Sequence, residues 1–192
     1  MRYPVVFDCE TKLTFRQVTN HSQLGITVVA AYDYKTEKLE VFEENELQKL
    51  FALLENASML IGFNIDGFDL PVLQPYYSGN VAQFKTFDIL SDIKRLLGRR
   101  ISLNDVVKAT LGREKSGHGL QAIQYYKEGK MDELKKYCSD DVVLTKELFD
   151  FGCKNGTIYY PSYSSGKEKL YVSWAKMLDY HGDDDISLTL PF

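Results

Sequence analysis

The sequence lacks the features that mark membrane-spanning, secreted or zinc-stabilised chains. No apolar run among its 192 residues approaches the roughly 20 residues that a membrane-spanning helix needs. The opening segment MRYPVVFDCE places acids where a secretory signal would continue its apolar stretch. Cysteine is scarce too: Cys9, Cys138 and Cys153 form no CxxC spacing, so neither a disulfide framework nor a zinc site is indicated. We therefore expect a cytoplasmic protein with no membrane partner.

An excess of positive charge is also missing. The 23 Lys and Arg residues are outnumbered by 27 Asp and Glu residues, which leaves a net charge of −4. Proteins that bind nucleic acid usually carry a basic surface, so this balance argues against that class. Metal-dependent nucleases are the exception, because their carboxylates add negative charge that bound divalent ions neutralise.

The order of apolar patterns predicts an α/β domain. Hydrophobic residues make up 44% of the chain and aromatic residues 13%, which is ordinary globular usage. Three β-rich runs predict an antiparallel meander; they cover residues 3–9, 24–34 and 39–42. Helical spacing over residues 43–55, followed by the apolar run 58–64, predicts a strand–helix–strand step at which the sheet becomes parallel. Further helices are expected at residues 69–76, 89–97, from an N-cap at Ser102, and at 131–151.

The chain changes character after Gly152. Tyrosine-rich alternating segments predict a hairpin between Ile158 and Trp174, and an acidic run and a tail follow. We therefore expect one domain over residues 1–152 and a C-terminal hairpin and tail over residues 153–192. The hairpin could pack on the domain or stack bases, and its pattern does not choose between them. The tail SLTLPF, from Ser187 to Phe192, resembles the short peptide with which bacterial proteins bind the replication sliding clamp, although Ser187 replaces the usual glutamine. A frayed end or an extra strand is the alternative.

Two carboxylates flank Cys9 at the end of the first expected strand. A period of two places Asp8 and Glu10 on one face of that strand. Carboxylates so close repel each other unless they are protonated or bridged by a cation, and Mg²⁺ or Mn²⁺ suits such oxygen ligands. Taken alone, Asp-x-Glu is a weak signal that is common at exposed strand ends.

A second polar cluster lies in the segment NIDGFD. Asn64 ends a buried run, and a tight turn leads to Phe68 and Asp69 at an expected helix start. Asp69 could be a helix cap and Phe68 a core residue. Because this strand would run parallel to the first, its carboxyl end would lie beside Asp8 and Glu10.

The third cluster, KYCSDD, opens the last long apolar helix. Residues four apart share a helical face, so Tyr137 and Asp141 should project together. Asp140 is rotated by about 100° and should meet solvent. The spacing favours Asp141 over Asp140 as the residue that faces a site, without deciding the choice.

Together these segments resemble, in chain order, the three motifs of the DEDD 3′–5′ exonucleases of the ribonuclease H-like superfamily. The segments are DCE, the N-x-x-x-F-D of NIDGFD and the Y-x-x-x-D of YCSDD. They are most similar to stretches of the proofreading domains of family B DNA polymerases, and the likeness covers residues 3–152. Tyr137 marks the tyrosine subtype, DEDDy. The histidine subtype would have an imidazole where Lys136 stands, and His118 lies out of register in the expected mobile loop 113–119.

The resemblance implies a ribonuclease H-like mixed sheet, with three antiparallel strands and then parallel strands, flanked by helices and followed by the C-terminal β-hairpin. It implies a metal-dependent 3′–5′ exonuclease that acts on single-stranded DNA or RNA, with DNA favoured, by a two-metal-ion mechanism with Mg²⁺ or Mn²⁺. The implied metal ligands are Asp8, Glu10, Asp69 and Asp141.

The resemblance also implies roles for three uncharged residues. Tyr137, whose ordinary pKa is about 10, would orient the attacking water rather than act as a full base. Asn64 and Phe68 would shape the substrate site. The expected phosphate contacts are Lys12, Arg16, Arg99, Arg100, Arg113 and Lys115.

Two other functions stay open at this point. One is a non-catalytic nucleic-acid-binding module of the same fold, and the other is a structure-specific endonuclease. A helicase or a polymerase is a possible partner under any of these readings.

Overall fold

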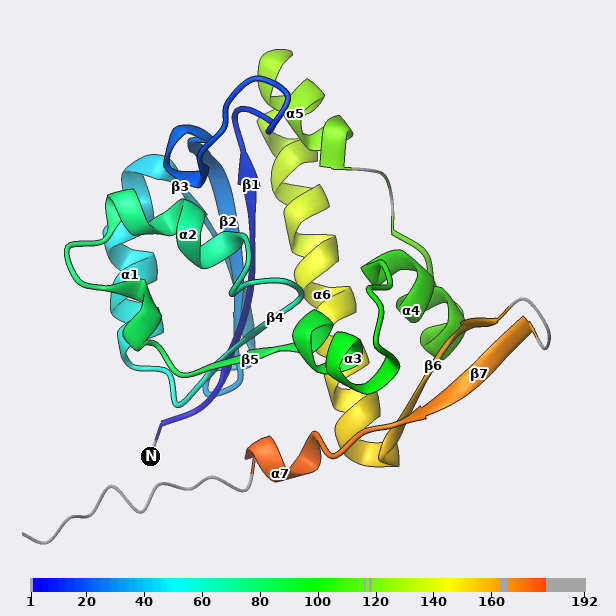
Figure 1. Cartoon of the computed structure of the whole chain (residues 1–192). Helices are drawn as coiled ribbons and strands as arrows, with labels where there is room; N and C mark the ends of the chain where they lie inside the picture. The colour runs from blue at the N-terminus through cyan, green and yellow to red at the C-terminus, as the bar shows by residue number, and fades with distance from the viewer. Residues whose placement is uncertain (1, 116, 118, 163–165, 179–192) are drawn as a thin grey trace, which may run out of the picture.

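Five strands form one mixed sheet in the computed structural model, which describes residues 2–115, 117, 119–162 and 166–178. The strands lie in the order β3-β2-β1-β4-β5 (Figure 1). β1 to β3 are antiparallel neighbours, whereas β4 pairs parallel with both β1 and β5. The expected change from antiparallel to parallel pairing is therefore confirmed. The strand bounds are Val5–Thr11 for β1, Ile26–Asp33 for β2, Lys38–Glu43 for β3, Leu60–Gly62 for β4 and Thr86–Asp88 for β5.

Helices cover both faces of this sheet, which explains why its central strands are apolar almost throughout. Val6 and Ile61 pack into a core cluster with residues of the long helix α6, whereas Val5 and Phe7 pack on the opposite face. Figure 1 shows α1 and α2 on one side of the sheet and α6 with α3 and α4 on the other. The helix bounds are Leu47–Glu55 for α1, Asp69–Leu73 for α2, Ile89–Leu97 for α3, Leu103–Leu111 for α4, Gly119–Lys127 for α5, Met131–Asn155 for α6 and Ala175–Leu178 for α7.

Local signals place several of the helix ends. The Ser102 hydroxyl accepts a hydrogen bond from the Asp105 amide at 3.1 Å, so the expected cap is confirmed. α4 ends at Gly112, whose φ of 68° is a left-handed conformation that glycine adopts without a Cβ clash. Single turns of 3₁₀ helix fill the connections, at His21–Gln23, Glu44–Glu46, Gln74–Tyr76 and Val81–Gln83.

Three features differ from the sequence-based expectations. The strand expected to run to Asn64 ends at Gly62, because Asn64 has a φ of 74° and turns the chain out of the sheet. β5 and α5 were not expected. β5 is a three-residue strand that pairs with β4 at one edge of the sheet, and α5 opens on Gly119, a poor helix former.

The C-terminal hairpin packs on the domain, which answers the question that its pattern left open. β6 (Thr157–Ser162) packs against α4 and α6, and β7 (Gly166–Tyr171) pairs antiparallel with β6 (Figure 1). Trp174, which is 1% exposed, stacks on Phe149 with ring centroids 6.0 Å apart, and its indole N–H donates to Asp92 at 2.8 Å. The hairpin thus contributes to the same core as α6. The tail from Ser187 to Phe192 lies outside the described residues.

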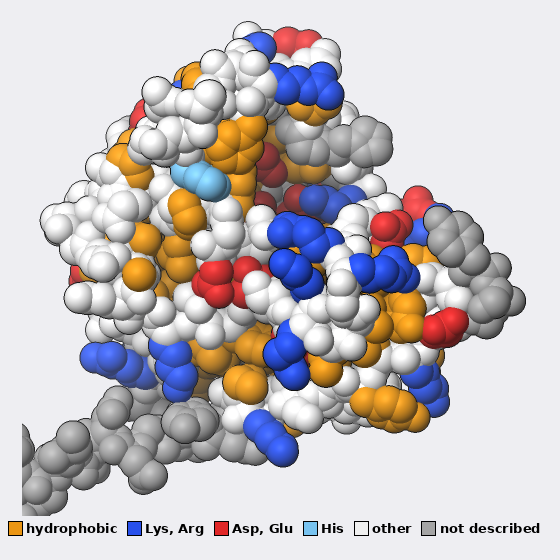
Figure 2. All heavy atoms as spheres, in the orientation of Figure 1, with side chains coloured by type: hydrophobic (Ala, Val, Ile, Leu, Met, Phe, Trp, Pro, Cys, Tyr) orange, Lys and Arg blue, Asp and Glu red, His pale blue; other side chains and the backbone are white. Residues whose placement is uncertain are grey.

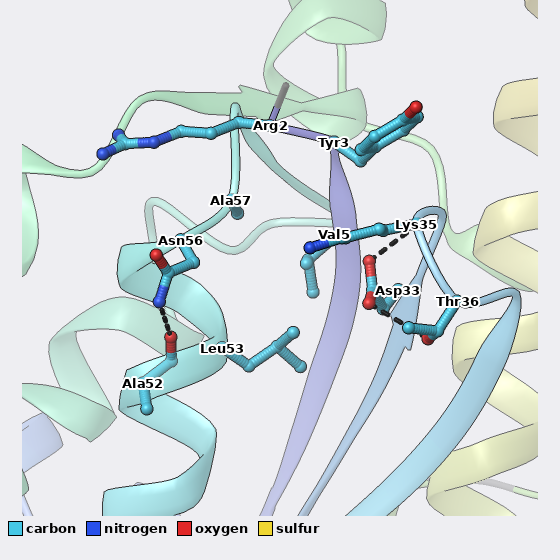
Figure 3. A pocket seen from close by; sticks show the side chains of 10 residues that line it. All are labelled: Arg2, Tyr3, Val5, Asp33, Lys35, Thr36, Ala52, Leu53, Asn56 and Ala57. Carbon is cyan, nitrogen blue, oxygen red and sulfur yellow. Dashed lines mark hydrogen bonds between the residues drawn. The ribbon is translucent and has the colours of Figure 1, made fainter.

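A hollow of about 330 Å³ lies near the start of β1 (Figure 3). Its one acidic side chain, Asp33, accepts hydrogen bonds from the Lys35 amide and the Thr36 hydroxyl in a turn. That carboxylate is used by the turn itself, and the clustered carboxylates lie at the other end of β1. Within the described part of the chain, no helix is both long and apolar enough to cross a membrane.

Candidate metal centre and active site

Three carboxylates from two distant segments meet at the end of β1. Asp8 and Glu10 share one face of that strand, and Asp141 projects from α6, which packs across it. One oxygen from each of the three side chains lies within 4.8 Å of the others. The Cys138 thiol donates to the Asp8 carbonyl at 3.4 Å and ties the helix to the strand at this point. The structure therefore brings together the first and third clusters that the sequence singled out.

Asp69 lies beside this trio but its carboxylate has a structural partner. It is the first residue of α2, is 2% exposed, and accepts a hydrogen bond from the Cys9 amide at 2.8 Å. That bond fixes the start of α2 against the end of β1. Asp69 lines the same hollow as the trio without belonging to it, so its role as a metal ligand stays a prediction.

The adjacent aspartates of α6 have opposite surroundings. Asp141 is 2% exposed and lies with Asp8 and Glu10, whereas Asp140 pairs with Lys136 at 2.7 Å on the outer side of the helix. Tyr137, one turn before Asp141, is buried and lines the same hollow. The helical spacing therefore placed both aspartates correctly.

Lys115 enters the carboxylate cluster from the connection between α4 and α5. Its ammonium lies 2.6 Å from Asp141 Oδ2, and the two side chains are only 21% and 3% exposed. The ammonium also lies 5.6 Å from the centre of the Tyr137 ring. The Lys115 amide donates to the Asn104 side chain at 2.8 Å, which anchors this part of the connection. The structure thus places this expected phosphate contact inside the carboxylate cluster, and its contact with phosphate stays a prediction.

Burial and mutual repulsion raise the pKa values of the clustered acids. Burial raises the pKa of Asp8 well above its ordinary value, and the nearby carboxylates add to the shift. Burial and the Asp141 charge raise the pKa of Glu10 to about 8, and burial raises the pKa of Asp69 to about 7. Burial lowers the pKa of Lys115, but the charges of Asp141 and Asp8 outweigh it and the net shift is upward. The clustered carboxylates would therefore be stabilised in their charged form by a bound cation.

The donor set fits a divalent metal ion. Asp141 Oδ1 is buried and has no hydrogen-bond partner among the residues that the structure describes. Such an atom costs free energy unless something coordinates it. Mg²⁺ and Mn²⁺ prefer hard carboxylate oxygens, and Asp8 and Glu10 supply two more beside it. The hydroxyl of Tyr137 is likewise buried and has no hydrogen-bond partner among the described residues. It is therefore free to bind a water molecule or a substrate atom.

The carboxylates lie at the bottom of a hollow of about 460 Å³. Figure 2 shows acidic side chains set back in a depression, with hydrophobic side chains along one edge and basic side chains beside it. Asn64 and Phe68 both line this hollow, as expected. The left-handed backbone of Asn64 presents its side chain to Arg100, whose guanidinium donates to the Asn64 Oδ1 at 2.8 Å. The second cluster therefore reaches the same site as the other two.

A protein-family model covers the segments that form this site. The family model described as the RNase_H superfamily matches residues 5–151, which include all three carboxylates of the trio. The chain belongs to the ribonuclease H superfamily. A search of curated proteins found no match.

Solved structures share the fold of this ribonuclease H-superfamily chain. A family B DNA polymerase from the archaeon Pyrobaculum calidifontis matches with a TM-score of 0.58 and 16% identity, covering 78% of this chain and 24% of the polymerase. RNase D of Trypanosoma brucei matches with a TM-score of 0.58 and 18% identity, covering 78% of this chain and 57% of RNase D. The same RNase D in complex with RNA U12 gives a TM-score of 0.56 and 16% identity, covering 78% of this chain and 55% of that one. This chain spans less than two thirds of each.

Most of the expected phosphate contacts of this ribonuclease H-superfamily chain have protein partners. Lys12 pairs with Glu44 at 2.6 Å, Arg113 pairs with Glu147, and Arg99 lies over the Tyr160 ring. Arg16 is exposed. Arg100 donates a hydrogen bond to Asn64, which lines the hollow. His118 lies outside the described residues.

Sequence reasoning missed the place of Lys115 and the exposed aromatic Phe15, which also lines the hollow. Both lie in connections, where no periodic pattern shows which way a side chain points.

Proposed function

We propose that this chain is a divalent-metal-dependent nuclease that removes nucleotides from the 3′ end of single-stranded nucleic acid, with DNA favoured over RNA. The observation that carries the proposal is the convergence of Asp8, Glu10 and Asp141 in an open hollow, with one buried oxygen of Asp141 left without a described partner. Membership of the ribonuclease H superfamily and the fold shared with RNase D support it. The tyrosine at position 137 agrees with the DEDDy subtype.

The metal would be held by the carboxylates, with Asp69 as the fourth candidate ligand. Two bound Mg²⁺ or Mn²⁺ ions would supply activation of water and neutralisation of charge on the leaving oxygen. Asp8 and Glu10 would orient the bound group from one strand face, and Asp141 from the facing helix.

Tyr137 would orient the attacking water through its hydroxyl. Burial raises the pKa of Tyr137 above its ordinary value, so the hydroxyl stays protonated at neutral pH and acts as a hydrogen-bond donor or acceptor rather than as a base. Asn64 and Phe68, which line the same hollow, would contact the nucleotide. Arg100 donates to the Asn64 side chain and so brings positive charge next to this lining residue.

A substrate panel tests this proposal directly. Single- and double-stranded DNA and RNA, labelled at either end, are incubated with Mg²⁺ or Mn²⁺, beside circular single-stranded DNA and the Asp8→Ala variant. We expect stepwise shortening from the 3′ end that requires metal and Asp8. Cleavage of the circle would show an endonuclease instead, and binding without any cleavage would show a non-catalytic module.

A further inference from the structure

Arg99 and Arg100 are adjacent arginines near the hollow, and no carboxylate neutralises either of them. Both side chains are exposed, and among the residues that the structure describes neither belongs to an ion pair. Arg95, on the helix just before them, differs because it pairs with Asp92 at 2.5 Å. We name Arg99 and Arg100 the arginine pair. An anion can bind this pair without first breaking a salt bridge.

A short, fixed connection carries the arginine pair. α3 ends at Gly98, whose φ of 72° and amide hydrogen bond to the Lys94 carbonyl at 2.8 Å close the helix. On the other side of the pair, Ile101 is 6% exposed and lies in the core, and the Ser102 cap then opens α4. The backbone of the pair is therefore fixed at both ends, so little of its freedom is lost when a ligand binds.

Arg100 is held against a residue that lines the hollow. Its guanidinium donates to Asn64 Oδ1 at 2.8 Å. The Asn64 backbone is fixed in turn, because its amide donates to the Asp88 carboxylate at 2.9 Å and Asp88 is only 5% exposed. A guanidinium has several N–H donors, so the bond to Asn64 leaves others for a phosphate.

Arg99 is oriented by the C-terminal hairpin. Its guanidinium carbon lies 5.7 Å from the centre of the Tyr160 ring on β6. The Tyr160 hydroxyl donates to Glu168 on β7 at 2.6 Å, which holds that ring in place. A guanidinium over an aromatic ring keeps the N–H groups along its edge available, and these groups match a phosphate bidentately. Tyr160 lies beyond residues 5–151, so this contact comes from outside the family match.

We propose that the arginine pair binds the phosphodiester backbone of the single strand outside the hollow, on the 5′ side of the terminal nucleotide. The inference rests on the proposed function, which places the 3′-terminal nucleotide in the hollow, so that the rest of the strand lies on its 5′ side. Figure 2 shows basic side chains beside the depression, and the pair spans from a lining residue to the hairpin. Phosphates carry no base identity, so this contact is independent of sequence.

The salt dependence of binding tests the arginine pair without relying on cleavage. Fluorescence anisotropy measures the affinity of metal-free protein in EDTA for a 5′-labelled single strand at about 50 mM and about 200 mM salt. Each phosphate contact on a single strand contributes about 0.7 to the slope of log affinity against log salt. With one phosphate for each arginine, Arg99→Gln/Arg100→Gln should make that slope shallower by about 1.4. Its deficit in affinity should then be about sevenfold larger at the lower salt concentration.

Lys35→Gln/Lys38→Gln is the control with a matched change in charge. Both lysines are exposed, and they lie in the turn before β3 and at its start, at the opposite edge of the sheet from β5, which leads into α3. This variant should keep the wild-type slope. An equal change of slope in the two double variants would reflect net charge alone and would overturn the proposal.

Two further measurements locate the contact on the strand and on the protein. A strand with neutral methylphosphonate linkages throughout its 5′ half should bind the wild type and the arginine variant alike. Tyr160→Ala should weaken binding of the ordinary strand in the wild type and have no further effect in Arg99→Gln. Equal losses in those two backgrounds would overturn the role of the ring.

The proposal also fails if the metal-free wild type does not bind the ordinary strand, or if the arginine variant binds the methylphosphonate strand more weakly than the wild type does. A salt-dependent loss in a protein that shows no nuclease activity would support the arginine pair and sink the proposed function, so the two failures are distinguishable.

Discussion

The buried hydroxyl of Tyr137 should lower the stability of the metal-free protein while it supports the reaction. Tyr137→Phe removes that oxygen and leaves the ring in place. A buried hydroxyl without a partner costs about 1–3 kcal/mol, and the Tyr137 hydroxyl has none among the described residues. We therefore expect the substitution to raise the free energy of unfolding of the metal-free protein by about 1–3 kcal/mol. For a chain of this size that corresponds to a rise in Tm of about 2–12 °C.

The same substitution should slow the reaction. Loss of one preorganised hydrogen bond in an active site typically lowers kcat by about 10²-fold or more, and KM should change little because the ring is kept. Calorimetry in EDTA measures the first effect and steady-state cleavage of a labelled strand with Mg²⁺ measures the second. A variant that is destabilised, or that keeps wild-type kcat, would refute the reasoning.

Tyr34→Phe is the control for the sign of the effect. The Tyr34 hydroxyl is partly buried but donates to Asp150 at 2.7 Å. Its removal breaks a made hydrogen bond, so we expect a loss of about 1–2 kcal/mol in stability with unchanged kcat. Opposite shifts in Tm for the two tyrosines would show that the partner of the hydroxyl, and not the loss of an oxygen, sets the result.

Three further predictions follow from the packing and the charges. Lys115→Met removes the ammonium that pairs with Asp141, so the free energy of unfolding, measured with urea in EDTA, should fall by about 3 kcal/mol. Saturating Mg²⁺ should reduce that loss, and equal stability of the variant and the wild type in EDTA would contradict the ion pair. The raised pKa of Glu10, about 8 against about 4.3 unfolded, means that the folded protein binds the extra proton, so stability of the metal-free protein should fall as pH rises from about 5 to 8. Titration calorimetry in buffers of different ionisation enthalpy should then show proton release on Mg²⁺ binding at pH 7, with less release in Glu10→Gln. Gly152→Ala places a Cβ against the Trp174 ring and should cost about 1–3 kcal/mol by thermal unfolding, with part of the loss recovered by an added Trp174→Leu.

The parts of the site that local pattern dictates could be predicted from the sequence. Alternation along a strand places Asp8 and Glu10 on one face, and the helical repeat separates Asp141 from Asp140. The parallel pairing of β4 with β1 follows from the helix that the pattern predicts directly before the apolar run of β4. These features depend on short-range periodicity, which a single sequence displays in full.

The parts that depend on tertiary contact could not be predicted. β5 is a strand because β4 offers it an edge, and its three residues carry too short a pattern to predict a strand. The ammonium of Lys115 reaches Asp141 because a connection between helices folds over the cluster, and the sequence of that connection shows only charge and glycine. Trp174 could have been assigned to a base-stacking hairpin or to the core, and only the space beside Gly152 and Phe149 decides it.

The adjacent aspartates of α6 give the most direct test of the central claim, which is that the trio of Asp8, Glu10 and Asp141 drives metal-dependent cleavage. Asp141→Asn and Asp140→Asn are made as a matched pair, and release of mononucleotides from a 3′-labelled single strand is measured with Mg²⁺. Asp141 belongs to the trio, whereas Asp140 pairs with Lys136 away from it. We predict that Asp141→Asn abolishes Mg²⁺-dependent release and that Asp140→Asn retains the wild-type rate. Retained activity in Asp141→Asn, or its loss in Asp140→Asn alone, would contradict the account.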